Sequence, residues 1–223
     1  MEDQASNLVQ LTIVQKDLPS IHMITEAGII GKIGFNSEGV GVCFNAIRAK
    51  GVDKNHIPVH LGLRLALESP SAETAVKSLE EVGMATSAHI LIGDATSAIG
   101  LEFTSTTFAR IPVNDNGFVV HSNHMRLHHP NICEPKWLED SPLRIETMEK
   151  NIQQTKKLSW ESFSELFEDE TNYPCSISRV AEGASDIATL FNITMELKSK
   201  RAVLREGRPV RGASRASEMN LAF

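Results

Sequence analysis

The sequence has few cysteines, no excess of basic residues and no long hydrophobic run. Its 223 residues include only three cysteines. That number is too small, and odd, for a disulfide framework, so we expect a reducing compartment. Lys and Arg number 22 against 28 Asp and Glu, a net charge of −6. Without a basic field we expect no nucleic-acid partner. No apolar run approaches the roughly 20 residues that span a bilayer, so we expect no membrane partner. The first fifteen residues lack a basic region and an apolar core, so we expect no signal peptide.

The remaining composition is typical of a globular domain. Hydrophobic residues make up 41% of the chain and charged residues 22%, and a chain of this length can bury a core of its own. We expect one domain over residues 1–206 and a loose, polar C-terminal tail over residues 207–223.

Hydrophobic periodicity predicts strands, two helices, strands, two helices and strands, in that order. Apolar stripes with helical spacing predict helices over residues 59–68 and 72–82, and two more that begin at Ser141 and Ser159. Alternation of apolar and polar residues predicts strands at about 8–14, 21–25, 29–35, 40–47, 87–93, 98–104, 107–113, 118–123 and 189–197, with a return strand after Lys200. Two antiparallel sheets between helix layers satisfy this α+β order.

Five glycines between residues 28 and 41 have the density of a loop that cradles a phosphate. No helix follows them at once, and the Lys-Ser/Thr ending of such a loop is absent. A pair of strands around a turn at residues 36–39 is therefore the favoured interpretation.

The densest cluster of candidate functional side chains is His121-Ser122-Asn123-His124, followed by His128-His129. The histidine spacing resembles that of metal ligands, but a run that leaves a strand for a loop need not converge on one ion. We therefore predict no metal site, and expect solvated loop histidines with one packed at the strand end. A carboxamide at a strand end, such as Asn123, can direct its NH2 group at a developing oxyanion, or can simply form a turn.

A second polar cluster covers residues 172–179. Its Arg179 can bind a substrate carboxylate, or can pair with an acid of the chain such as Glu182. Cys175 has no histidine or cation next to it in the sequence that would activate a thiol. Cys43 lies inside a hydrophobic strand and is interpreted as a small packed residue.

Six segments of the sequence, taken in order, have the character of a known family. They are ITEAGIIGKIGFNSEGVGV, HLGLRLALES, GLEFTSTT, VVHSNH, NYPCSISR and TLFNITME. Together they resemble the acyl-coenzyme A:6-aminopenicillanic acid acyltransferase family, from about residue 7 to about residue 209. The resemblance implies the αββα sandwich of N-terminal nucleophile hydrolases, which agrees with the α+β order of the predicted elements.

The resemblance also implies a mechanism and three site residues. In this family a precursor cleaves itself, and the newly exposed N-terminal cysteine becomes the nucleophile, with its own α-amino group as the base. An amine with a pKa of about 8 can accept a thiol proton, and the thiolate then forms an acyl-enzyme. By resemblance, Asn123 helps to hold the oxyanion and Arg179 lies beside the nucleophile. Asn45, on a matching strand, is a substrate-binding candidate near the pocket.

The segment that carries this nucleophile is not matched within the 223 residues. The resemblance places it ahead of the segment similar to residues 8–14, so we expect the first strand of the sandwich to be missing here. The internal cysteines Cys43, Cys133 and Cys175 are not expected to replace it, because the base must be the α-amine of the same residue.

The resemblance implies a protein of fungal secondary metabolism. We expect it to transfer an acyl group from acyl-coenzyme A, as co-substrate, to an amine such as a β-lactam nucleus or an amino-acid derivative, with no cofactor. An N-acyl amide hydrolase of the same fold, and a truncated, non-catalytic remnant that only binds a ligand or partner, are the alternatives. The partner is expected to be a small-molecule substrate, and the sequence sets no oligomeric state. The ending Leu221-Ala222-Phe223 does not match a peroxisomal tripeptide, so a cytoplasmic location is predicted, with the peroxisome as the alternative.

Overall fold

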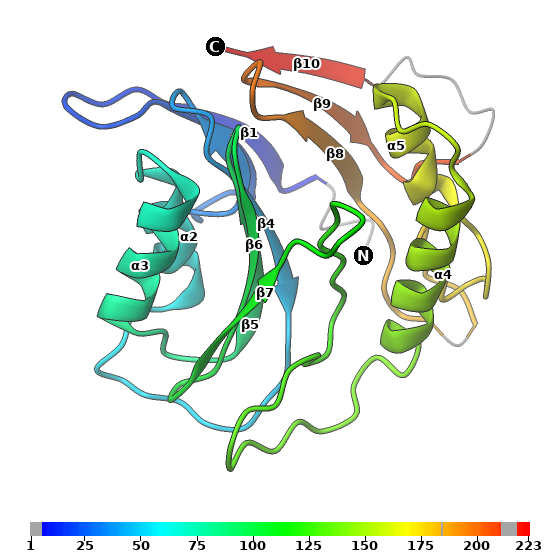
Figure 1. Cartoon of the computed structure of the whole chain (residues 1–223), viewed down its shortest axis with the longest axis horizontal. Coiled ribbons are helices and arrows are strands. Elements are labelled where there is room, and N and C mark those ends of the chain that lie inside the picture. Colours follow the sequence, from blue (N-terminus) through cyan, green and yellow to red (C-terminus); the bar gives the residue numbers. More distant parts are fainter. Residues whose placement is uncertain (1–5, 184, 211–217) are drawn as a thin grey trace. The chain divides into compact units, whose positions relative to one another are not determined.

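The computed structural model describes residues 6–183, 185–210 and 218–223 (Figure 1). These residues divide into two compact units. The larger unit comprises Leu8–Leu138, Glu196–Lys200 and Phe223. The smaller unit comprises the described residues of Met1–Asn7, Glu139–Met195 and Arg201–Ala222. None of the described helices combines the length and the apolarity that a bilayer crossing requires.

The larger unit is built on a seven-stranded sheet. All neighbouring strands are antiparallel, and their order in the sheet is their order in the sequence. The elements of this unit are β1 (Leu8–Ile13), β2 (Ile21–Glu26), β3 (Ile33–Asn36), β4 (Gly41–Ala46), α2 (Val59–Leu67), α3 (Ala72–Val82), β5 (Ala88–Gly93), β6 (Ala98–Phe103) and β7 (Phe108–Pro112). The helix pair α2–α3 is therefore an insertion between two paired strands, β4 and β5.

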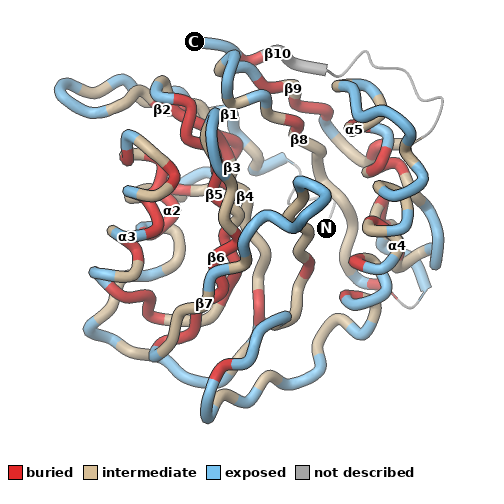
Figure 2. The backbone as a smooth tube through the Cα atoms, in the orientation of Figure 1, coloured by how far each residue is buried: buried red, intermediate tan, exposed pale blue. Residues whose placement is uncertain are grey.

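Helices α2 and α3 cover one face of this sheet (Figure 1). Because side chains alternate between the faces of a strand, every second residue of β2, β4, β5 and β6 meets the helices. Figure 2 shows buried residues concentrated along the two helices and the strands beneath them. The core formed there includes Ile21, Met23, Val42, Leu63, Leu67, Val76, Leu79, Ile90, Ile92, Leu101 and Phe103.

The ends of α2 and α3 confirm the two predicted helices. The side chain of Ser71 caps α3 by accepting a hydrogen bond from the Thr74 amide at 3.2 Å, and capping of this kind satisfies a backbone donor that the helix itself leaves unpaired. Gly83 follows the helix with φ of 72°, a left-handed conformation that glycine adopts without strain.

Asn36 ties the end of α2 to the sheet. This residue is fully buried, and its Nδ2 donates to the carbonyls of Leu67 and Ser69 at 2.9 and 2.8 Å. Its Oδ1 accepts from the amides of Glu38 and Val40 at 3.0 and 2.9 Å. One side chain thus closes the β3–β4 turn and satisfies two carbonyls at the end of a helix, where no intrahelical donor reaches them.

The smaller unit combines a three-stranded sheet with helices. The sheet has the order β10-β9-β8, and β10 pairs with β9 in antiparallel fashion. A buried ion pair joins Arg205 of β9 to Glu168 at 2.8 Å. Ser159 and Ser162 form a capping box at the start of α5. The elements of this unit are α4 (Ser141–Gln154), α5 (Trp160–Glu165), η1 (Leu166–Glu168), β8 (Phe191–Glu196, whose last residue is counted with the larger unit), β9 (Arg201–Glu206) and β10 (Glu218–Ala222).

The structure differs from the sequence-based predictions in two places. The predicted strand over residues 118–123 is wrong, because this segment is irregular. Instead of a ladder, the Phe118 carbonyl accepts from the Asn114 amide at 2.9 Å and the Val120 carbonyl accepts from Arg126 Nη1 at 2.7 Å. The tail expected from residue 207 contains strand β10, paired with β9, so part of it belongs to a sheet. The single domain over residues 1–206 stays a prediction.

We predict that Asn36→Ala lowers the free energy of unfolding by about 2–4 kcal/mol, because it leaves two buried carbonyls and two amides without their partner. Urea unfolding followed by circular dichroism measures the change. Asn114→Ala is the matched control, since Asn114 also accepts from two amides but lies in an exposed turn. Its cost is expected to stay below about 1 kcal/mol. Equal losses in the two variants contradict the assigned role of Asn36.

Candidate functional site

The second face of the seven-stranded sheet carries a row of three polar residues. The strand register pairs Asn45 of β4 with His89 of β5, and His89 with Glu102 of β6. Their strand neighbours Ile90 and Leu101 belong to the core under the helices, so the three polar side chains lie on the opposite face. Three apolar strands thus bring together an amide, an imidazole and a carboxyl group.

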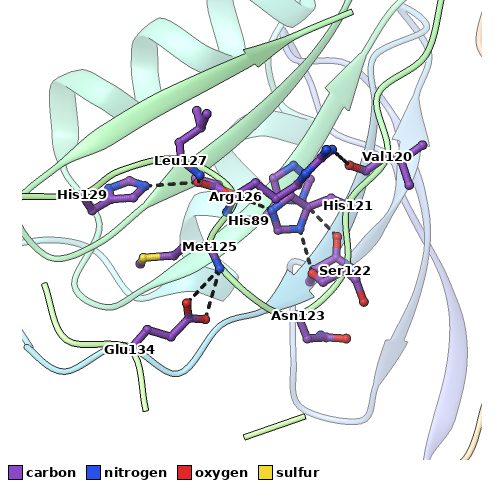
Figure 3. A network of polar contacts seen from close by, with 12 residues as sticks. His89, Val120, His121, Ser122, Asn123, Met125, Arg126, Leu127, His129 and Glu134 are labelled. Atoms are coloured by element: carbon purple, nitrogen blue, oxygen red, sulfur yellow. Dashed lines mark hydrogen bonds and ion pairs between the residues drawn. The ribbon is translucent and has the colours of Figure 1, made fainter. Parts of the chain in front are cut away.

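Glu102 is fully buried and accepts four hydrogen bonds from residues 121–129. Its Oε1 accepts from His121 Nε2 at 2.7 Å and from the Arg126 amide at 2.6 Å. Its Oε2 accepts from the Leu127 amide at 3.0 Å and from His129 Nε2 at 3.3 Å. Figure 3 shows His121, Arg126, Leu127 and His129 of this segment, with dashed lines for the contacts between the residues drawn. Burial by itself would raise the pKa of Glu102, but the bonds from His121 and the two amides outweigh it, and the pKa is lowered.

A second glutamate, Glu134, binds another backbone amide of the same segment. Both oxygens of Glu134 accept from the Met125 amide at 3.1 Å. Three successive amides, at positions 125, 126 and 127, therefore point at two carboxylates. Burial, and next the charge of Glu102, raise the pKa of Glu134 above its ordinary value, although the bond from Met125 opposes them.

His121 donates from both of its ring nitrogens. Nε2 faces the Glu102 carboxylate, and Nδ1 faces the carbonyl of Ser122 at 2.8 Å. A backbone carbonyl and an ionised carboxylate can only accept, so both contacts are hydrogen bonds only when both ring nitrogens carry hydrogen. The side chains of His121 and Glu102 are both at most 2% exposed, and with the ring protonated they form a buried ion pair.

His89 stacks on His121 and is neutral. The two rings are 3.6 Å apart between centroids and 9° from parallel. His89 Nδ1 contacts Asn45 Oδ1 at 3.0 Å, and therefore donates, while Nε2 has no hydrogen-bond partner. Burial, followed by the charges of His121 and Arg126, lowers the pKa of His89 to about 2. The ring also requires glycine at position 100, because a Cβ there would lie 2.7 Å from Nε2.

Asn123 and Asn45 lie at the same end of β4. Asn123 Nδ2 donates to the carbonyl of Ala46 at 3.1 Å, so its amide is held beside the residue that follows Asn45. Figure 3 shows Asn123 next to Ser122 and His121. Asn123 does not end a strand as expected, because residues 118–123 are irregular. Within the larger unit the structure thus brings these two candidate residues together.

Arg179 belongs to the smaller unit, where it forms a buried ion pair. Its Nη1 and Nη2 donate to the two oxygens of Asp140 at 2.5 and 3.0 Å, and its Nε donates to Ser185 Oγ at 2.9 Å. Asp140 also accepts from Arg144 at 2.7 Å. Burial alone would raise the pKa of Asp140, but the two guanidinium groups lower it. The partner is Asp140 and not Glu182, the acid suggested by the sequence.

Two histidines of the run at residues 121–129 contact the carboxylate of Glu102. The expectation of a single packed histidine is wrong, because His121 and His129 are both buried against Glu102, whereas His128 is exposed. No group of three His, Cys, Asp or Glu among the described residues has the geometry to hold a metal ion.

The three cysteines lie in different surroundings. Burial raises the pKa of the Cys43 thiol to about 11, so near neutrality this group is a thiol and a poor nucleophile. Cys133 is exposed and Cys175 is partly buried. The packed role predicted for Cys43 agrees with its position in β4.

Comparison with known proteins identifies the family. The family model described as Acyl-coenzyme A:6-aminopenicillanic acid acyl-transferase matches residues 1–211. The chain belongs to this family. It is similar to the acyl-coenzyme A:6-aminopenicillanic-acid-acyltransferase 40 kDa form of Emericella nidulans, with 47% identity over 209 residues, which cover 91% of this chain and 57% of that relative. The chain thus spans little more than half the length of this acyltransferase.

Two solved structures show the fold of this acyltransferase-family chain. A mutant conjugated bile acid hydrolase from Clostridium perfringens has a TM-score of 0.61 at 14% identity, over 97% of this chain and 83% of that one. Penicillin V acylase from Agrobacterium tumefaciens has a TM-score of 0.52 at 10% identity, over 84% of this chain and 66% of that one. These likenesses confirm the predicted α+β fold of the N-terminal nucleophile hydrolase type.

Two residues of the acyltransferase-family site, Glu102 and His89, were missed by sequence reasoning. Each is a single polar residue in an otherwise apolar strand, Glu102 in AIGLEF and His89 in AHILIG. A buried acid or histidine in such a strand requires hydrogen-bond partners. This requirement could have identified Glu102 and His89 as candidate site residues from the sequence. The register of β4 and β5 places His89 opposite its partner Asn45, whereas the partners of Glu102 come from the irregular residues 121–129.

His89 is expected to make the folded chain sensitive to acid. The unfolded chain binds a proton on this ring below about pH 6.5, whereas the folded chain, with the pKa lowered to about 2, does not. The contribution of His89 to stability is therefore complete above pH 6.5 and is lost as the pH falls, by about 1.4 kcal/mol per pH unit. Unfolding free energies of wild type and His89→Phe at pH 7, 6, 5 and 4 measure it. If both proteins lose stability with the same slope, His89 is not the group responsible.

Proposed function

We propose that this chain forms part of an acyltransferase that moves an acyl group from acyl-coenzyme A to an amine in fungal secondary metabolism. Membership of the acyltransferase family, through the match over residues 1–211, is the observation that carries the proposal. The 47% identity to the Emericella nidulans protein supports coenzyme A thioesters as donors and a β-lactam nucleus as an acceptor to test first.

The proposed reaction has two halves. A cysteine thiol passes its proton to its own α-amine, sulfur bonds to the acyl carbon, and the bond to coenzyme A breaks as the thiol of coenzyme A leaves with a proton. An amine then attacks the acyl-enzyme, loses a proton and restores the cysteine thiol. Each half passes through a tetrahedral oxyanion, which Asn123 is proposed to stabilise through its amide N–H. Asn45 is proposed to contact substrate.

Hydrolysis of simple N-acyl amides is the second candidate. It is favoured by the likeness of the fold to that of a penicillin V acylase and a bile acid hydrolase. Water then replaces the amine in the second half of the reaction. Assays with phenylacetyl-coenzyme A plus 6-aminopenicillanic acid, and separately with N-acyl amides, distinguish transfer from hydrolysis.

The test compares the 223-residue chain with an extended form, in which a segment beginning with the nucleophilic cysteine is joined ahead of Met1. Turnover is expected from the extended form alone, because Cys43, Cys133 and Cys175 lie inside the chain and have no α-amine base. Turnover by the 223-residue chain that is lost on replacing one of these cysteines would reveal a relocated nucleophile. Absence of turnover in both forms rejects the proposed function.

In the extended form, Asn123→Ala is predicted to lower kcat by about 10²–10³-fold, as for the loss of one oxyanion donor. The cost in folding stability is expected to be about 1 kcal/mol, because the bond to the Ala46 carbonyl is also lost. Steady-state kinetics and urea unfolding provide the two measurements, with Asn114→Ala as control. Full activity in a folded Asn123→Ala variant removes Asn123 from the mechanism.

Arg179→Lys is predicted to impair the extended form and to lower the unfolding free energy by about 2–3 kcal/mol. A lysine ammonium cannot reproduce the two parallel bonds to Asp140 together with the bond to Ser185. Arg208→Lys is the control, since Arg208 pairs with the more exposed Glu170 and its replacement is expected to cost less than about 1 kcal/mol. A role near the nucleophile is supported if kcat falls in Arg179→Lys under conditions where the protein is fully folded. Unchanged kcat restricts Arg179 to a structural role.

A further inference from the structure

The residues that precede and follow Asn123 are attached to one buried carboxylate. Residues 121–129 belong to no strand or helix, so no ladder of backbone bonds holds them. Glu102 receives donors from the beginning, middle and end of this stretch, namely His121, the amides of Arg126 and Leu127, and His129. An irregular segment is thereby fixed to β6, which lies between β5 and β7 in the sheet.

The shortest connection from Glu102 to Asn123 consists of two hydrogen bonds through one ring. His121 Nε2 donates to Glu102, and His121 Nδ1 donates to the carbonyl of Ser122. That carbonyl belongs to the peptide unit that ends at the nitrogen of Asn123. Because a peptide unit is planar, fixing its oxygen also fixes the direction in which the chain enters Asn123.

The ring of His121 has little freedom to move. His89 stacks on one face at 3.6 Å, and His89 is itself held by Asn45 at 3.0 Å and confined by Gly100. Asn45 precedes Ala46, whose carbonyl accepts from Asn123 Nδ2 at 3.1 Å. The path through His121 therefore ends at the backbone of Asn123, and the path through His89 and β4 ends at its side-chain amide. Figure 3 shows His89, His121, Ser122 and Asn123 of these paths.

We propose that Glu102 and His121 are positioning residues, which hold the amide of Asn123 in the orientation needed to meet an oxyanion. The catalytic part of this inference rests on the proposed function, whereas the positioning part concerns only the folded chain. Charge matters to the arrangement: each carboxylate oxygen meets two donors, and His121 can donate twice only as the imidazolium. A neutral amide at position 102 would place an NH2 group against some of those donors.

The first test measures positioning by nuclear magnetic resonance in the 223-residue chain. Both ring nitrogens of His121 are expected to give protonated, imidazolium-type ¹⁵N signals at neutral pH. The side-chain NH2 signals of Asn123 are expected to shift, and to exchange faster with water, in Glu102→Gln. Glu168→Gln is the control, because it removes another buried carboxylate, paired with Arg205 in the smaller unit, and should leave the Asn123 signals in place.

If Glu102→Gln does not fold, a second variant, His121→Phe, provides the same test. His121→Phe retains an aromatic ring against His89 but deletes both hydrogen bonds, and it is expected to change the Asn123 signals in the same way. Unchanged Asn123 signals in either folded variant, or an unprotonated nitrogen on His121 in the wild type, overturn the proposal.

The second test uses kinetics of the extended form. Glu102→Gln is expected to lower kcat about 10–100-fold with little change in KM, as for a misdirected catalytic group. If Glu102 acts through Asn123, the double variant Glu102→Gln/Asn123→Ala has the same kcat as Asn123→Ala alone. If the kcat losses of the two single variants instead multiply in the double variant, the proposal is overturned. If the extended form has no turnover at all, the proposed function fails, and the magnetic resonance test still decides whether Glu102 and His121 position Asn123.

Discussion

The carboxylate of Glu102 is the interaction on which the polar half of the larger unit depends. An ionised group with no exposed surface is stable only when its oxygens are surrounded by donors. Here those donors come from a single irregular stretch, residues 121–129. Satisfying one buried charge therefore determines the path of a segment that has no secondary structure of its own, and the position of Asn123 follows from that path.

The two faces of the same strands stabilise the molecule in different ways. One face buries aliphatic side chains such as Ile90 and Leu101 against α2 and α3, where packing tolerates changes of similar volume. The other face aligns Asn45, His89 and Glu102, whose hydrogen bonds depend on direction and protonation state. Substitutions on the helix face should mainly alter stability. Those on the polar face also alter which atoms donate and accept near Asn123.

The sequence supports prediction of the regular elements better than of the site. Helix α3 was predictable from its apolar stripe and from Ser71 at its start, since both signals are local. The interpretation of residues 118–123 as a strand failed because Arg126 bonds to the Val120 carbonyl and Glu102 bonds to His121, and no local pattern predicts either bond. Glu102 was not predicted as a site residue for a related reason: its partners His121 and His129 are about 20 residues away or more, in an irregular segment whose path no strand pattern predicts.

Asn123 and Arg179, the two residues singled out by family resemblance, share a structural circumstance. Each lies in an irregular segment, and each segment is held by a buried or half-buried acid, Glu102 in the larger unit and Asp140 in the smaller unit. A strand would restrict such a side chain to one of two opposite directions. A segment fixed by charge-assisted hydrogen bonds can present it at another angle and still remain rigid. The acids are thus as important to the direction of Asn123 and Arg179 as the sheets are to the stability of the fold.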